Sequence, residues 1–149
     1  MSLSLKETID RANKDGVKYL LTISTEDKSY DKILNIISNN ECVYGSYGIH
    51  PHEAKNHQSI KSEDIIKKTE LNNKIIGIGE SGLDFYYNHS DKKDQIKCFE
   101  EHIIAAQNTQ LPLIVHTRNA ETETLEILKN KLNQRLHFSQ KQEGGGVVS

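Results

Sequence analysis

The sequence contains no tryptophan, one methionine and only two prolines in 149 residues. It also lacks an excess of either charge, because 19 lysine and arginine residues face 21 aspartate and glutamate residues, for a net charge of −2. Proteins that hold nucleic acid on a broad basic face carry a clear positive excess. Any contact with nucleic acid is therefore expected at a local site and not over a wide surface.

Cysteine is scarce, and long apolar runs are missing. Cys42 and Cys98 lie far apart, in a predicted strand and a predicted helix, which suits free thiols in a reducing compartment better than a disulfide. The first ten residues carry no apolar signal core, and no run approaches the length of a membrane span. We therefore expect a cytoplasmic protein without a membrane partner.

Short apolar runs alternate with amphipathic segments along the chain. The runs predict four strands, at Val17–Ile23, Cys42–Ile49, Ile75–Gly79 and Leu113–His116. Apolar residues spaced three and four apart predict about five helices around these strands. This alternation is typical of an α/β fold in which helices cover a parallel sheet.

The last predicted helix is capped by Asn119 and turns Leu125, Leu128 and Leu132 inward. The helical pattern fails from Asn133 onward. We expect one domain over residues 1–139 and a disordered tail over residues 140–149, which are polar and rich in glycine.

The segment Lys74–Tyr87 (KIIGIGESGLDFYY) organises the candidate chemistry. Glu80 directly follows the third apolar strand, and Ser81-Gly82 is a turn signal that should end this strand. Asp84 follows behind it. An acid at the carboxyl end of a strand is where α/β folds keep their chemistry; the alternative is that Glu80 only caps a loop.

Two other predicted strands also end in groups that bind metal or phosphate. The second leads into His50 and His52, and the fourth ends in His116 with Arg118 behind it. Parallel strands bring their carboxyl ends to one edge, so these groups are expected to converge. Imidazole and carboxylate suit divalent zinc, manganese or magnesium, and Arg118 can contact a phosphate. The alternatives are a simple turn at His50-Pro51-His52 and an ion pair of Arg118 with Asp84 or a neighbour.

Three motifs make the chain resemble the TatD family of metal-dependent deoxyribonucleases. They are Gly45–Ala54 (GSYGIHPHEA), Gly77–Tyr87 (GIGESGLDFYY) and Leu111–Leu128 (LPLIVHTRNAETETLEIL), and the likeness covers about residues 5–132. The resemblance implies a (β/α)8 TIM barrel of the amidohydrolase type that hydrolyses DNA phosphodiesters with two divalent ions. It implies that Glu80 is the catalytic, bridging metal ligand and that His116 is a further metal ligand. It places His50 and His52 beside the pocket.

The departures from the family pattern indicate an incomplete barrel. Family members open with a strand ending in His-x-His, yet this chain has no histidine before His50, and it has no aspartate after Asp94 to serve as the late metal ligand. Leu136–Ser139 (LHFS) resembles the family's strand with a further metal histidine, which would make His137 a ligand. A full barrel takes roughly 200 residues or more. We therefore expect about half of a TIM barrel, with four parallel strands.

Three functional hypotheses follow from these residues. The first is a fragment of a DNA-cleaving two-metal hydrolase that is inactive or weakly active unless a second chain complements it. The second is a non-enzymatic half barrel that self-associates, because open sheet edges favour association. The third is a mononuclear site formed by His50, His52, Glu80 and His116, which requires all four side chains in one coordination sphere.

Overall fold

The computed structural model describes the backbone of residues 4–144 and the side chains of residues 4–134. In chain order the elements are α1 (Leu5–Lys14), β1 (Leu20–Thr22), η1 (Asp27–Ser29), α2 (Tyr30–Asn39), β2 (Val43–Tyr47), η2 (Pro51–Asn56), α3 (Ser62–Thr69), β3 (Ile75–Asp84), α4 (Lys92–Thr109), β4 (Leu113–Arg118) and α5 (Glu121–Gly144), where η marks a 3-10 helix.

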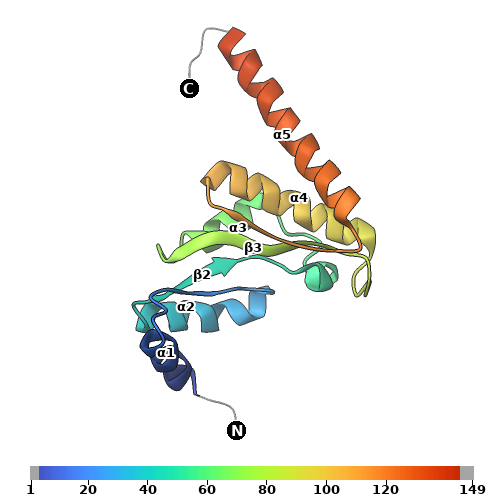
Figure 1. Cartoon of the computed structure of the whole chain (residues 1–149). Coiled ribbons are helices and arrows are strands. Elements are labelled where there is room, and N and C mark those ends of the chain that lie inside the picture. The colour runs from blue at the N-terminus through green and yellow to red at the C-terminus, as the bar shows by residue number, and fades with distance from the viewer. Residues whose placement is uncertain (1–3, 145–149) are drawn as a thin grey trace.

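Over the described residues the strands form one four-stranded sheet in the order β1-β2-β3-β4. Every neighbouring pair is parallel, so the predicted sheet and its order are confirmed. Figure 1 shows α2 and α4 lying alongside the sheet, while the long helix α5 runs away from it beyond α4. The arrangement is a curled half barrel of the expected α/β class.

The core lies between the sheet and its covering helices. Ile33 and Ile37 from α2 pack with Val43 and Tyr47 from β2, and all four side chains are buried. Burying an aliphatic or aromatic side chain of this size contributes about 1.5–3 kcal/mol. The Tyr30 hydroxyl also donates to the Lys68 carbonyl at 2.7 Å, which ties α2 to α3.

The opposite side of the sheet is left open at several strand positions. Leu21 in β1 and Ile76 in β3 are 44 and 42 % exposed, whereas Leu20 and Ile75, the residues that precede them, pack in the core. This alternation is the period of a strand with one covered face. The sheet therefore presents apolar side chains on the side away from its helices.

The turn predicted at Ser81-Gly82 is wrong, because β3 continues through Asp84. Gly82 pairs with His116 of β4, and a Cβ atom at Gly82 would collide with the His116 carbonyl oxygen. Its φ of +150° is also one that side-chain-bearing residues rarely adopt. Glycine is therefore needed here for the close approach of two strands and not for a reversal.

The chain after β4 differs from its prediction in three ways. Asn119 has a left-handed φ of +51°, and α5 begins after it at Glu121. Leu125 and Leu132, predicted to face inward, are 56 and 55 % exposed, while Leu128 is partly buried against the core cluster of Phe99. The predicted tail from residue 140 falls partly in α5, which reaches Gly144, and partly on residues 145–149, outside the described range.

Candidate metal centre

Side chains from three segments converge at one edge of the sheet. His50 follows β2, Glu80 lies within β3 and His116 lies in β4. One ligand atom from each of the three lies within 4.8 Å of the other two. The Nδ1 atom of His116 is 3.2 Å from Oε1 of Glu80, and these two side chains are 23 and 29 % exposed. The group is therefore open to solvent and has the imidazole and carboxylate donors that suit a divalent ion.

Backbone hydrogen bonds from the segment after β1 fix this edge. The Glu80 amide donates to the Ser24 carbonyl at 3.0 Å, and the His50 amide donates to the Thr25 carbonyl at 2.8 Å. The hydroxyl of Ser46 in β2 donates to the Gly79 carbonyl at 2.7 Å. Hydrogen bonds from β2 and from the segment after β1 thus hold Gly79 and Glu80. These two residues lie in the part of β3 where its register with β4 shifts.

Asp84 contacts His52 and His116 and fixes the orientation of both rings. Its carboxylate is buried, and Oδ2 lies 3.0 Å from Nε2 of both His52 and His116. Oδ1 accepts hydrogen bonds from the amides of Tyr86 and Tyr87 at 3.1 Å. Burial acts to raise the pKa of Asp84, yet the hydrogen bonds from the Tyr87 amide, His116 and His52 hold it well below its ordinary value.

The ionised Asp84 decides which nitrogen of His116 is available to a metal. Because Oδ2 can only accept, the Nε2 atom of His116 carries the hydrogen and donates to it. Nδ1 is then the nitrogen on the side of the Glu80 carboxylate, where a cation bound between the two groups would take its lone pair. Carboxylate–histidine–metal arrangements of this kind fix the tautomer and raise the basicity of the ligand. Glu80 and His116 Nδ1 are therefore the pair best placed to hold a cation.

His50 is arranged as a hydrogen-bond donor. Its Nδ1 atom accepts from the His52 amide at 3.2 Å. Burial, followed by the nearby charges of His116 and His52, lowers the pKa of His50 to about 4. The ring is therefore neutral at pH 7 with its hydrogen on Nε2, and ligation through Nδ1 would require breaking the existing bond.

The other predicted site residues are placed as follows. His52 belongs to the neighbourhood through Asp84, but the three-residue group found among the described side chains does not include it. Arg118 lies with its guanidinium carbon 4.2 Å from the centre of the Tyr86 ring and 4.7 Å from that of Tyr87. Among the described residues it forms no ion pair with Asp84. The backbone of His137 lies in α5 and not in a strand, and its side chain is outside the described range.

The sequence contains a signal for the role of Asp84 that the predicted turn conceals. Glu80 and Asp84 are four residues apart, and strand residues at even spacing share a face. The assumed turn at Ser81-Gly82 hid this relation, because a reversal would have sent Asp84 away from Glu80. The uninterrupted β3 brings both acids to His116.

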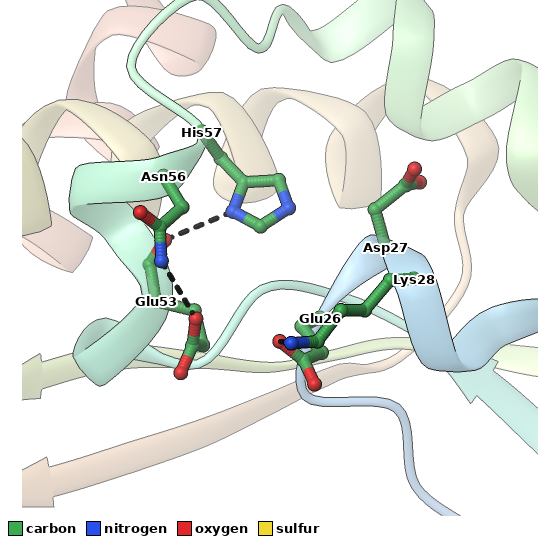
Figure 2. Close-up of a pocket in the computed structure, with 6 residues that line it drawn as sticks. All are labelled: Glu26, Asp27, Lys28, Glu53, Asn56 and His57. Atoms are coloured by element: carbon green, nitrogen blue, oxygen red, sulfur yellow. Dashed lines mark hydrogen bonds and ion pairs between the residues drawn. The ribbon is translucent and has the colours of Figure 1, made fainter.

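Of the hollows formed by the described residues, one borders His50 and His52. A hollow of about 260 Å³ is lined by Thr25, His50, His52 and Glu53. The second, of about 310 Å³, is lined by six residues that Figure 2 labels, namely Glu26, Asp27, Lys28, Glu53, Asn56 and His57. There Asn56 donates to the Glu53 carboxylate at 3.0 Å and His57 Nδ1 donates to the Glu53 carbonyl at 2.9 Å. Because these polar groups satisfy one another, we place the candidate centre at the histidines.

Comparison with known proteins identifies the family of the chain. The family model described as "TatD related DNase" matches residues 2–143. An uncharacterized metal-dependent hydrolase of Buchnera aphidicola is 38 % identical over 130 residues, which are 85 % of this chain and 47 % of that protein. The 3'-5' ssDNA/RNA exonuclease TatD of Citrobacter koseri is 28 % identical over 128 residues, 86 % of this chain and 49 % of the relative.

A solved structure shows the same fold. The TatD homologue YJJV of Escherichia coli K12 superposes with a TM-score of 0.74 at 24 % identity, over 84 % of this chain and 49 % of that one. The chain thus spans about half the length of the relatives it matches. With the family model matched along nearly the whole sequence, the chain belongs to the TatD-related DNase family.

Proposed function

We propose that this chain carries part of the site of a metal-dependent deoxyribonuclease that cleaves phosphodiester bonds with divalent zinc, manganese or magnesium. The observation that carries the proposal is the position of His116 between two carboxylates, with Asp84 at Nε2 and Glu80 at Nδ1. This donor set fits a divalent ion, since one ligand atom each of His50, Glu80 and His116 lies within 4.8 Å of the other two. Family membership and the nuclease relative from Citrobacter koseri support DNA as the substrate.

Each proposed residue has a distinct role. Bound metal would lower the pKa of a coordinated water and neutralise charge that develops on the phosphate. Glu80, the proposed catalytic residue, ligates through its carboxylate, and His116 ligates through Nδ1. His50 donates from Nε2 to a phosphate oxygen, while His52 lines the same hollow. The flat face of the Arg118 guanidinium lies on the Tyr86 ring, and its in-plane N–H groups, which have no partner among the described side chains, can donate to a phosphate.

The described half barrel supplies too few ligands to hold two ions firmly. Glu80 and His116 remain the ligand pair, and His137 stays a proposed third ligand whose side chain lies outside the described residues. We therefore expect the isolated chain to bind metal weakly and to cleave DNA little or not at all. A second polypeptide that completes the barrel would supply the missing ligands.

The second candidate function is a half barrel that self-associates without catalysis. The exposed apolar side chains on β1, β3 and β4 favour it, because open strands and uncovered apolar faces promote association. We also keep the cytoplasm as the proposed location, which the free thiols of Cys42 and Cys98 support. Within residues 4–144, none of the helices has the length and apolar character needed to cross a membrane.

Metal titration of the purified chain tests the proposed site. We expect weak binding of manganese or zinc that becomes at least about tenfold weaker in Glu80→Gln, because a ligand is lost. Glu63→Gln, at an exposed position of α3, is the matched control and should bind like the wild type. Equal binding by the wild type and Glu80→Gln would overturn the proposed metal site.

Single-turnover cleavage of a labelled oligonucleotide tests the expected weak activity. Little or no cleavage by the isolated chain is expected with any of the three metals. Robust cleavage that disappears in Glu80→Gln would support the site but contradict the view that half a barrel is insufficient. Cleavage of equal size in both proteins would indicate a contaminating nuclease.

A further inference from the structure

An exposed aromatic cluster lies directly beside the candidate metal centre. Tyr86 and Tyr87 follow β3 and are 55 and 49 % exposed. Single exposed apolar residues are common on protein surfaces and need no explanation. Here, however, the guanidinium of Arg118 contacts both rings, and the imidazole of His89 stacks on Tyr87. We call these four planar side chains the aromatic platform.

The members of the aromatic platform contact one another through their faces and edges. The rings of Tyr86 and Tyr87 meet edge to face, with centres 4.7 Å apart and an interplanar angle of 88°. Arg118 covers both rings, and His89 is stacked on Tyr87 at 5.4 Å and 15°. Mutual contacts of this kind hold the rings in place while about half of each tyrosine stays accessible to solvent.

The same residues that build the metal centre also fix the backbone of the aromatic platform. Asp84 accepts from the Tyr86 and Tyr87 amides, and the Phe85 amide donates to the Arg118 carbonyl at 3.0 Å. The His52 ring lies 5.7 Å from that of Tyr87 and 6.3 Å from that of His116. The distance between the rings and the candidate metal ligands is therefore set by fixed elements and not by a freely moving loop.

We propose that Tyr86, Tyr87 and Arg118 form a subsite on which an unpaired base of a single-stranded oligonucleotide stacks, next to the phosphate that faces Glu80 and His116. The choice of an oligonucleotide as the ligand rests on the proposed function. Every base has a flat π face, so exposed rings and a guanidinium bind bases with little regard to sequence. Bases inside a duplex have both faces covered by their neighbours, so only a single strand or a frayed end offers one.

The net charge of the chain explains why contacts to the bases would matter for affinity. With a net charge of −2, the protein has no large basic surface with which to hold a polyanion. Contacts to the bases therefore have to supply affinity that phosphate contacts alone would supply in a basic protein. Arg118 contributes to both, because its face lies on the tyrosines while its N–H groups form no hydrogen bond or ion pair with the side chains that the structure describes.

The test is a binding experiment without metal, using the full chain in chelator at low salt. Fluorescence anisotropy compares a labelled oligothymidylate with an abasic oligomer of the same length and charge and with a blunt duplex. We expect the oligothymidylate to bind the wild type at least about tenfold more tightly than the abasic oligomer or the duplex. Equal affinity for the oligothymidylate and the abasic oligomer would overturn the proposal, and this comparison requires no variant.

Variants then assign the base contact to particular side chains. The double variant Tyr86→Ala/Tyr87→Ala should bind oligothymidylate about tenfold more weakly, or about 1.4 kcal/mol, within the range for one stacked base. Its affinity for the abasic oligomer should not change. Tyr86→Phe/Tyr87→Phe keeps the ring faces and should bind like the wild type, as should Tyr19→Ala at a distant exposed tyrosine.

The possible outcomes separate this subsite from the proposed nuclease site. Base-dependent binding by a wild-type chain that takes up no metal would remove the metal site and leave the stacking subsite. Metal uptake without base-dependent binding would do the reverse. An equal loss for both oligomers in the alanine double variant would show that the rings only support the fold or await a protein partner, and would overturn the proposal.

Discussion

At the scale of single residues, Asp84 is the side chain on which the candidate centre depends most. It is buried, it is ionised, and it accepts from His52, His116 and two backbone amides. A buried carboxylate with four hydrogen-bond donors is worth more to the structure than a surface ion pair, since each donor would otherwise lose its partner. Its contribution is to position His116 and not to touch the substrate.

We predict that Asp84→Asn weakens binding of manganese or zinc about 10–100-fold, the range found for partners that orient a metal-binding histidine. An amide NH₂ facing Nε2 of His116 cannot accept its hydrogen, so the tautomer with Nδ1 free is no longer favoured. Isothermal titration calorimetry measures the change, with Asp10→Asn in the exposed face of α1 as the matched control. Unchanged affinity in Asp84→Asn would show that His116 is oriented by something else.

At the scale of the elements, the sequence predicts the sheet better than it predicts the site. Continuous apolar runs such as Ile75–Gly79 mark buried strands whatever surrounds them, and their alternation with helices gives the parallel order. The failures have local causes. Ser81-Gly82 has the composition of a turn, but Gly82 serves the close contact with β4. The spacing of Leu125 and Leu132 marks one side of α5 without showing whether anything packs against it.

Helix α4 carries a fully buried histidine, His102, that joins it to the segment leading into the candidate centre. The Nε2 atom of His102 accepts from the Ile49 amide at 3.0 Å, and Nδ1 donates to the Cys98 carbonyl at 2.7 Å. Burial lowers the pKa of His102 to about 4. The neutral ring satisfies both backbone groups, whereas a protonated ring would present a hydrogen to the Ile49 amide.

We predict that the free energy of unfolding falls as the pH drops from about 6.5 to about 4. The ordinary pKa of 6.5 for histidine lies above the value of about 4 for His102 and His50, so the unfolded chain takes up protons first in this window. Urea denaturation at several pH values measures the slope. His102→Gln should be less stable at pH 7 but should show a shallower slope, and an unchanged slope would contradict the assignment to His102.

At the scale of the whole molecule, an open half barrel is expected to associate. Apolar side chains on the side away from the helices and unpaired edges at β1 and β4 both favour contacts between chains. We predict that sedimentation velocity shows a concentration-dependent increase in size. Leu21→Lys and Val115→Lys should reduce it by placing charges on the strands, whereas Thr122→Lys on exposed α5 should not. A monomer at all concentrations would contradict this prediction.

The two oxygens of Asp84 serve different tasks, and this limits how the molecule can change over evolution. Oδ2 orients His116, while Oδ1 holds the amides of Tyr86 and Tyr87. A rotation of the carboxylate alters both at once, so a lineage cannot adjust metal affinity through this residue without also moving the rings. Independent adjustment has to come from the ring side chains themselves. Substitutions should therefore accumulate at Tyr86 and Tyr87 among descendants that change substrate, while position 84 stays fixed.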